Sequence, residues 1–371
     1  MVDSNKIKEF AKVLVEHSAQ VQKGDNVYIL STSVESQPLF EEVRRQVIKK
    51  GAYPHEHFVY DSQIGAEGLD YDYAKHGSIE QMRHVSETKL EEIKAMDAYI
   101  RIGGEGNTKE LTGIDSEKIS KRKQAGEDIL TERLSTKWVA TRYPTNAMAQ
   151  EAGMPTQEFE EFVFDAVTGI DWEKQHEKNL EIKEVFDNAE EVRIVSEGTD
   201  LRFSLESREG ISSHGLRNMP DGEVFYAPEK NSVRGHITFS HPALSSGNEI
   251  TGIRLEFDEN GRIKAYSAEK NGEYLEKMIE TDEGSHFIGE FGIGTNREID
   301  QYIKNTLFDE KIGGTVHFAI GRAYEECVPE GEERNDSGVH WDIVKDLREK
   351  DDGGKIFVDG ELVQENGQWV F

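Results

Sequence analysis

The sequence predicts an α/β N-terminal domain, with a parallel sheet flanked by helices, followed by a mainly antiparallel α+β C-terminal domain. The chain has 371 residues, which is long for a single hydrophobic core. Up to residue 189, short apolar runs alternate with charged helical patterns. From residue 190 the pattern changes to alternation at period two, which is typical of half-buried strands. We therefore expect the domains to span residues 1–189 and 190–371.

The first half alternates predicted strands and helices. The run DNVYIL (25–30) is rich in β-branched and aromatic residues, which is typical of a buried strand. A helical pattern follows at 38–52, with Pro38 in its first turn and Gly51 near its end. The later elements are a strand at 53–61, an amphipathic helical region at 71–96, a strand at 97–104, a helical pattern at 116–133 and a strand at 137–144. This alternation favours a parallel sheet covered by helices.

Two further segments of this half have simpler interpretations. The Gly-rich tract IGGEGN (102–107) lacks the glycine spacing of phosphate-binding loops, so we interpret it as an ordinary loop. Residues 154–189 have a helical pattern with Asp171 as a candidate N-cap, and we expect them to bridge the two domains.

The second half predicts a mainly antiparallel sheet. Strand-like runs occur at 191–206, 236–240, 252–269, 315–321 and 355–371. The tetrapeptides ENGR (259–262) and VDGE (358–361) carry residues typical of hairpin turns. A helical pattern at 271–283 interrupts the strands.

The composition limits the partners and the compartment. With 73 acidic and 44 basic side chains, the net charge is −29, which disfavours nucleic acid and anionic membranes as partners. The sequence contains no apolar run long enough to span a membrane and no signal-peptide pattern, so we expect a cytoplasmic protein. The single cysteine, Cys327, cannot form an internal disulfide, and we interpret it as a small buried apolar residue. Any metal would therefore bind oxygen and nitrogen ligands.

The stretch VHWDIV (339–344) carries the first candidate ligands. Because side chains alternate along a strand, His340 and Asp342 share one face. The pair fits two interpretations: a buried histidine hydrogen-bonded to its neighbouring aspartate, or two ligands of a divalent cation.

The rest of the second half favours the metal interpretation. Six His, Asp and Glu residues stand in apolar or glycine-bounded contexts: Glu223, Glu290, Glu310, His317, His340 and Asp342. So many carboxylates cannot share a partly buried cleft unless cations neutralise them, and two divalent ions would do so. Tyr324 follows His317 by seven residues, and it is either an aromatic core residue or a hydrogen-bond donor in the same cleft.

Five motifs in this order resemble the aminopeptidase T family, which also includes aminopeptidase S and PepS: DGEVFYAP, GEFGIGTN, LFDEKIGG, HFAIGRAY and HWD. The start of the chain, FAKVLVEHSAQVQKGDNVYIL, also resembles this family, so the resemblance covers most of the chain.

The resemblance implies a metal-dependent aminopeptidase that removes N-terminal residues from short peptides with a free N-terminus. It implies a homodimer and two divalent ions per chain, such as zinc, cobalt or manganese. The residues that match the family's metal ligands are Glu223, Glu290, Glu310, His317, His340 and Asp342, and Tyr324 matches its catalytic tyrosine. Glu290 is in addition our candidate for the general base, or it serves only as a bridging ligand.

Two alternatives use the same residues differently. Another dinuclear metallohydrolase, an amidohydrolase or a phosphoesterase, would cleave a different bond with the same ligands. A non-catalytic metal-binding or peptide-binding protein would bind metal without turnover of any peptide.

Overall fold

The computed structural model describes residues 3–59, 69–245, 247–349 and 353–371, and its contacts divide the chain into two compact units. The first unit comprises Met1–Ile170 and Gly215–Pro220, and the second comprises Asp171–His214 and Asp221–Phe371. This division differs from the boundary expected after residue 189. The predicted bridge (154–189) is divided between the units: residues 154–170 belong to the first. Residues 171–189 belong to the second, because their apolar side chains, including Phe186, pack into the core of that unit.

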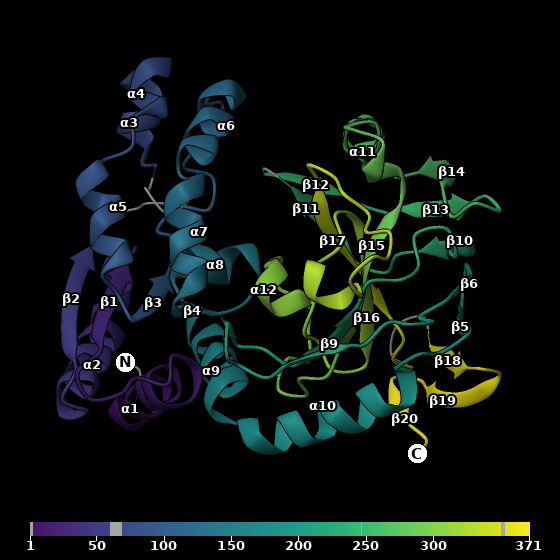
Figure 1. Cartoon of the computed structure of the whole chain (residues 1–371), viewed down its shortest axis with the longest axis horizontal. Coiled ribbons are helices and arrows are strands. Elements are labelled where there is room, and N and C mark those ends of the chain that lie inside the picture. Colours follow the sequence, from purple (N-terminus) through teal and green to yellow (C-terminus); the bar gives the residue numbers. More distant parts are fainter. Residues whose placement is uncertain (1–2, 60–68, 246, 350–352) are drawn as a thin grey trace. The chain divides into compact units, whose positions relative to one another are not determined.

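The first unit contains a five-stranded parallel sheet in the order β2-β1-β3-β4-β8. A parallel sheet is the arrangement that the sequence predicts, and the four strands expected from the sequence, β1 to β4, are labelled in Figure 1. Its strands are β1 (Asn26–Ser31), β2 (Tyr53–Phe58), β3 (Ala98–Gly103), β4 (Lys137–Arg142) and β8 (Asn218–Met219). On one face, Tyr28 and Tyr99 pack against apolar side chains of two helices. These are Ile93 of α5 (Glu87–Lys94) and Ile129 of α7 (Glu127–Ser135). Tyr60 and Asp61, the end of the strand predicted for 53–61, lie outside the described residues.

The helices of the first unit follow the predicted order. They are α1 (Ser4–Lys12), which continues as a π-helix over Val13–Ser18, α2 (Gln37–Lys49), α3 (Tyr71–His76), α4 (Ile79–Arg83), α5 (Glu87–Lys94), α6 (Ser116–Ala125), α7 (Glu127–Ser135), α8 (Asn146–Glu151) and α9 (Thr156–Thr168). The amphipathic region 71–96 forms three helices, because Ser78 and Ser86 each start a new helix as its N-cap. Across the described ranges, none of the helices is both long and apolar enough to cross a membrane.

The second unit contains a large antiparallel sheet in the order β14-β13-β10-β6-β5-β18-β19-β20. Its strands are β5 (Val192–Ser196), β6 (Thr199–Phe203), β10 (Arg234–Thr238), β13 (Arg254–Phe257), β14 (Ile263–Ser267), β18 (Gly354–Val358), β19 (Glu361–Glu365) and β20 (Gln368–Trp369). A separate pair is formed by β11 (Ala243–Ser245) and β12 (Asn248–Ile250). The antiparallel arrangement confirms the fold predicted from the period-two pattern.

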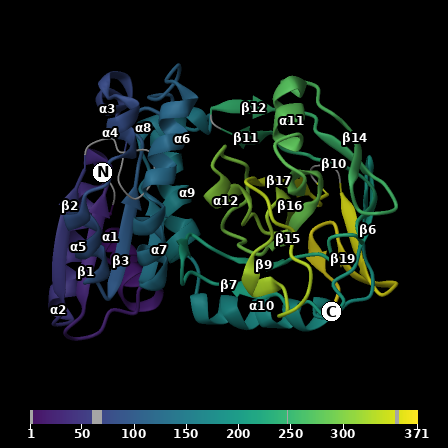
Figure 2. The ribbon, with the colours of Figure 1, turned by 45° about the horizontal axis from the view of Figure 1, so that its top comes forward.

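A second antiparallel sheet in this unit has the order β17-β16-β15-β9-β7. Its strands are β7 (Ile211–Ser213), β9 (Glu223–Tyr226), β15 (Ile288–Gly294), β16 (Thr315–Gly321) and β17 (His340–Asp346). The helices of the unit are α10 (Trp172–Phe186), which lies against β7 and β9 (Figure 2), α11 (Gly272–Ile279) and α12 (Thr306–Asp309). Asp171 is the N-cap of α10, as predicted, and accepts a hydrogen bond from the backbone N–H of Lys174.

The hydrophobic core of the second unit lies between its two large sheets. Phe203 of β6 contacts Phe291 of β15 and Phe318 of β16, with ring centroids 4.8 Å and 5.7 Å apart. Trp341 and Ile343 of β17 join the same core. These side chains alternate with polar ones along each strand, so the opposite face of the five-stranded sheet is available to polar groups.

Candidate metal centre

The strand pairing brings the predicted ligands to the polar face of the five-stranded sheet. Across neighbouring strands, Glu290 pairs with Ala319, which pairs with Asp342. His317 lies opposite Gly292, two residues further along each strand and therefore on the same face. Ala319 thus lies between Glu290 and Asp342, and Gly292 lies opposite His317. These small residues leave room for the charged side chains to converge.

The first group, which we call the buried cluster, consists of Glu223 from β9, Glu290 from β15 and His317 from β16. His317 Nε2 lies 3.4 Å from Glu223 Oε2 and 3.3 Å from Glu290 Oε1. One ligand atom from each residue lies within 4.8 Å of the others, and all three side chains are buried. Two carboxylates and one imidazole at these distances match the ligands of a divalent cation.

The second group, which we call the outer cluster, consists of Glu290, His340 and Asp342, again with ligand atoms within 4.8 Å of one another. His340 Nε2 lies 3.2 Å from Glu290 Oε2 and 3.6 Å from Asp342 Oδ1. His340 Nδ1 lies 2.8 Å from the carbonyl oxygen of Arg322. Because a carbonyl only accepts hydrogen bonds, Nδ1 carries a proton and Nε2 is directed at the carboxylates.

Glu290 belongs to both clusters, and each of its oxygens faces a different imidazole. Three buried carboxylate oxygens accept no hydrogen bond from the residues that the structure describes: Glu223 Oε2, Glu290 Oε2 and Asp342 Oδ1. Buried acceptors without partners are costly, and a cation is the partner that satisfies several of them at once. The residues therefore fit a metal site.

Interactions among the charged side chains of the clusters, together with burial, shift the pKa values of these side chains. Burial alone would raise the pKa of Glu290, but its interactions with His317 and His340 lower that pKa to about 2. Burial opposes the charged imidazoles, yet the neighbouring carboxylates raise the pKa of His317 to about 9 and that of His340 to about 10. Burial raises the pKa of Asp342 to about 6. Without metal, protons on the imidazoles therefore supply the positive charge that the carboxylates require.

Lys311 is a residue of this centre that the sequence analysis missed. Its side chain is only 1% exposed, and its Nζ lies 2.5 Å from Glu223 Oε1 and 2.7 Å from Glu310 Oε1. Asp221 Oδ1 lies 4.0 Å from the same nitrogen. Although burial lowers the pKa of a lysine, these carboxylates raise that of Lys311 well above its ordinary value.

Glu310 is the predicted ligand that neither cluster includes. It lies close enough for its charge to raise the pKa of Asp342, but its own carboxylate is paired with Lys311. The structure thus brings five of the six predicted ligands into the two clusters, and Glu310 lies beside them.

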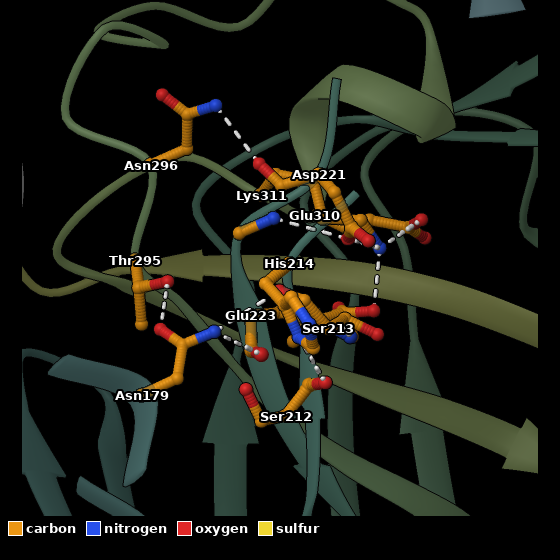
Figure 3. A network of polar contacts seen from close by, with 12 residues as sticks. Asn179, Ser212, Ser213, His214, Asp221, Glu223, Thr295, Asn296, Glu310 and Lys311 are labelled. Atoms are coloured by element: carbon orange, nitrogen blue, oxygen red, sulfur yellow. Dashed lines mark hydrogen bonds and ion pairs between the residues drawn. The ribbon is translucent and has the colours of Figure 1, made fainter. Parts of the chain in front are cut away.

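A polar network fixes the backbone of β9 beneath the centre (Figure 3). Asn179 of α10 donates hydrogen bonds from its amide nitrogen to the carbonyl oxygens of Ser213 and Glu223, each at 3.0 Å. Gln175 and Thr295 both donate to the Asn179 side-chain oxygen, at 2.9 Å. These contacts hold the strand that carries Glu223 against the helix.

Tyr324 lies beside the outer cluster and is not a core residue. The residue is 45% exposed, and the centroid of its ring lies 4.9 Å from that of His340 and 5.5 Å from that of Phe225. Loss of water around the hydroxyl and the charges of Glu290 and Asp342 raise the pKa of Tyr324, so the phenol stays protonated. Its hydroxyl can therefore act as a hydrogen-bond donor.

Cys327 is buried, as expected for a small apolar residue. Burial raises the pKa of the thiol, which disfavours the thiolate that a nucleophile requires.

Gly292 is a feature of the sequence that indicates the metal centre. A Cβ atom at this position would overlap the imidazole of His317, so only glycine leaves space for that ring. Gly292 in GEFGIG therefore records the close approach of a neighbouring side chain, whereas Gly289 and Gly294 lie against backbone atoms. Lys311 carried no such signal, because a lysine between Glu310 and Ile312 has the sequence pattern of an exposed turn.

Comparison with known proteins gives similarities over about three quarters of the chain or more. The chain is 29% identical to aminopeptidase AmpS of Bacillus subtilis, and the alignment covers 99% of each chain. It is 30% identical to aminopeptidase T of Thermus aquaticus, over 73% of this chain and 76% of that one. Among solved structures, AmpT from Thermus thermophilus has the same fold, with a TM-score of 0.80, 22% identity and 99% of each chain covered.

The family resemblance of the five sequence motifs is confirmed by the family comparison. The sequence model of the thermophilic metalloprotease (M29) family matches residues 3–369, and the chain therefore belongs to this metalloprotease family.

Proposed function

We propose that this metalloprotease is an aminopeptidase that removes N-terminal residues from short peptides with two divalent ions bridged by Glu290. The observation that carries the proposal is that Glu290 belongs to both clusters. Its Oε1 faces His317 and its Oε2 faces His340. Two ions about 3.5 to 4 Å apart, bridged by a shared group, are the usual arrangement in dinuclear hydrolases, aminopeptidases among them.

The ligands of the proposed centre divide between the clusters. Glu223 and His317 would hold one ion, His340 and Asp342 would hold the other, and Glu290 would bind both. Bound there, the ions would polarise the scissile carbonyl and lower the pKa of the attacking water. The contact between His340 Nδ1 and the Arg322 carbonyl supports this assignment, because it keeps Nε2 directed at the centre.

The geometry supports the bridging role of Glu290 over the role of general base. Both of its oxygens face an imidazole, whereas a base needs an oxygen that faces the water from which it takes the proton. We therefore assign Glu290 as the shared ligand.

Tyr324 is our candidate for stabilising the transition state. It lies at the exposed edge of the outer cluster, where a substrate can approach, and its hydroxyl keeps its proton. In the proposed reaction the phenol donates a hydrogen bond to the tetrahedral oxyanion that forms when water adds to the peptide carbonyl. The proton that the added water gives up then passes to the amine of the departing peptide, the scissile C–N bond breaks, and the N-terminal residue leaves as a free amino acid.

The substrate class follows from the relatives and from the charge of the site. The relatives reported above are named aminopeptidases. A centre rich in carboxylates suits a substrate whose free α-amino group binds beside them. We propose zinc, cobalt or manganese as the metal, and a homodimer, as the resemblance implies. We also propose that the protein acts in the cytoplasm. Light scattering would test the dimer.

The proposed function is tested by elemental analysis together with hydrolysis of leucine p-nitroanilide in the presence of cobalt, zinc or manganese. We expect two ions per chain and metal-dependent release of p-nitroaniline, with no release from acetyl-leucine p-nitroanilide. Equal cleavage of the acetylated compound would contradict the requirement for a free amine. Metal without peptide hydrolysis, together with cleavage of p-nitrophenyl phosphate, would support the phosphoesterase alternative.

A further inference from the structure

Two arginines of the parallel sheet lie close together on one face of the first unit. Arg101 of β3 pairs with Ala140 of β4, and Gly103 at the end of β3 pairs with Arg142 at the end of β4. Because side chains alternate along a strand, these four residues share a face. A Cβ atom at Gly103 would overlap the guanidinium of Arg142, so this arginine lies across the end of β3. The two small residues therefore leave space for the guanidinium groups beside them.

Two further arginines approach the same face. Arg133 belongs to α7, which packs against β4 (Figure 1). Its Cζ lies 5.6 Å from the ring centroid of Tyr99 and 5.1 Å from that of Trp138, and Tyr99 and Trp138 pair across β3 and β4. The Cζ of Arg217 lies 5.7 Å from the ring centroid of Trp138. Tyr99 stands two residues before Arg101 and shares its face. We call Arg101, Arg133, Arg142 and Arg217 the arginine cluster.

The arginine cluster carries more positive charge than the described carboxylates balance. In the part of the chain that the structure describes, Glu105 is the one carboxylate that pairs with it, with Oε1 3.6 Å from Arg142 Nη1. The Nε atoms of Arg101 and Arg133 are buried and donate no hydrogen bond to any described residue. Burial and the charges of Arg142 and Arg133 lower the pKa of Arg101 to about 10. Like charges with unused donors destabilise a fold unless an anion accepts from them.

We propose that the arginine cluster is a binding site for a small molecule that carries phosphate or carboxylate groups. Guanidinium groups form paired hydrogen bonds with the oxygens of both groups. The cluster lies toward the carboxyl ends of β3 and β4, which is the edge at which open α/β sheets bind ligands. Arg101, Arg133 and Arg142 are partly exposed, so an anion can reach them from solvent.

The charge of the whole chain favours a small anion over a macromolecule. The net charge of −29 repels nucleic acid and anionic membranes, which would meet acidic surface around the cluster. A small anion contacts the arginines alone. The site belongs to the first unit, whereas the metal centre belongs to the second, so this inference does not rest on the proposed function.

The test is calorimetric titration of the full-length, metal-loaded protein with inorganic phosphate and, separately, with succinate. Ionic strength is held constant with sodium chloride, and unbound metal is removed beforehand. We expect saturable binding of at least one of the two anions, and the tighter one identifies whether the site prefers phosphate or carboxylate. In Arg101→Gln the affinity should fall about 10- to 100-fold, as for loss of a hydrogen bond between charged groups. Arg83→Gln is the matched control, because it removes the same charge from an exposed position of the same unit.

Thermal unfolding gives a second readout. Without phosphate or succinate, Arg101→Gln should unfold at the wild-type temperature or above it, because the substitution removes a charge that neighbouring arginines repel. The anion that binds should raise the unfolding temperature of wild type and of Arg83→Gln, but not that of Arg101→Gln. Arg142→Gln, with a side chain that is 28% exposed in wild type, provides the same comparison if Arg101→Gln does not fold.

The outcomes separate the arginine cluster from the metal centre and from general screening of charge. Binding that persists in Arg101→Gln but disappears from metal-free wild type would belong to the metal ions and would overturn the inference. An equal loss of affinity in Arg83→Gln would overturn it too, because any lost charge would then have the same effect. Failure of both anions to bind wild type would also overturn it, and none of these results would alter the proposed aminopeptidase activity.

Discussion

The buried cluster and the outer cluster use the same chemistry in different surroundings. His317, the imidazole of the buried cluster, is fully buried, and its Nδ1 has no hydrogen-bond partner among the described residues. His340, the imidazole of the outer cluster, is 21% exposed, and the Arg322 carbonyl fixes its Nδ1. The buried cluster is neighboured by the ammonium of Lys311, and the outer cluster by the exposed ring of Tyr324.

This difference indicates a division of labour between the two clusters. The buried side chains hold positions that depend on the fold, so we expect the first ion to contribute mainly to structure and to the placement of Glu290. The outer side chains meet solvent, so we expect the second ion to contact the substrate and to exchange more readily. The following predictions can break or sharpen this comparison.

The largest loss of turnover is expected from Glu290→Gln, because Glu290 is the one residue that the two clusters share. Loss of both ions should lower turnover by about 10,000-fold or more, since each ion stabilises the transition state by several kcal/mol and about 1.4 kcal/mol corresponds to tenfold. Elemental analysis and hydrolysis of leucine p-nitroanilide measure this, with Glu273→Gln on the exposed face of α11 as the control. A variant that keeps one ion and half of the activity would show that the clusters are independent.

The next largest effect is expected from Tyr324→Phe. Removal of one donor to an oxyanion lowers kcat by roughly 10- to 1000-fold, while both ions should remain bound. Tyr266→Phe is the matched control, since Tyr266 is a partly exposed tyrosine of the same unit on β14. Unchanged turnover in Tyr324→Phe would show that the Tyr324 hydroxyl does not stabilise the oxyanion, and metal binding would then be the remaining role of the outer cluster.

The pH dependence of metal binding should differ between the clusters. In the metal-free chain the pKa of His317 is about 9 and that of His340 is about 10, both raised by the surrounding carboxylates against the effect of burial. Below these values each imidazole must lose a proton before it binds metal, so affinity should rise about tenfold per pH unit for each proton released. The metal affinity should stop rising near pH 9 for the buried cluster and near pH 10 for the outer cluster, because each imidazole has lost its proton above that pH.

Calorimetric titration with zinc in several buffers would count the released protons. An affinity that does not change between pH 7 and pH 9 would contradict the assignment of the imidazoles as ligands.

The smallest effect is a difference in thermal stability between two histidine variants. His317→Ala leaves two buried carboxylates without their imidazole, and each unsatisfied group costs about 1–3 kcal/mol. We therefore expect metal-free His317→Ala to unfold at a temperature several degrees below metal-free His340→Ala, because about 1 kcal/mol shifts Tm by roughly 2–4 °C in a unit of this size. Equal unfolding temperatures in calorimetry would remove the structural distinction between the clusters.

Two strands of the sheet that carries the centre, β16 and β17, could be predicted from the sequence. Alternation at period two placed His340 and Asp342 on one face, and the pairing of β17 with β16 confirms this. The same rule could not place Lys311, because it lies after a short helix where no fixed period relates its direction to that of Glu310. The pairing of a lysine with three carboxylates depends on contacts between residues that are distant in sequence.

The domain boundary shows a second limit of sequence patterns. The change of pattern at residue 190 marks where strands begin, but it does not say which core the preceding helix joins. Ile182 and Phe186 of α10 pack into the core of the second unit. An amphipathic pattern identifies the apolar face of a helix without identifying the partner of that face.

The strand pairing of the centre also bears on how the chain folds. The buried cluster draws on β9, β15 and β16, and the outer cluster on β15 and β17. The whole centre is therefore complete only after strands that span residues 223 to 342 have paired. Contacts that are this distant in sequence form slowly, because long loops must close before any interaction compensates for the lost entropy. A nascent chain on the ribosome therefore has no assembled centre until β17 has emerged, and a partly synthesised protein cannot cleave the peptides around it.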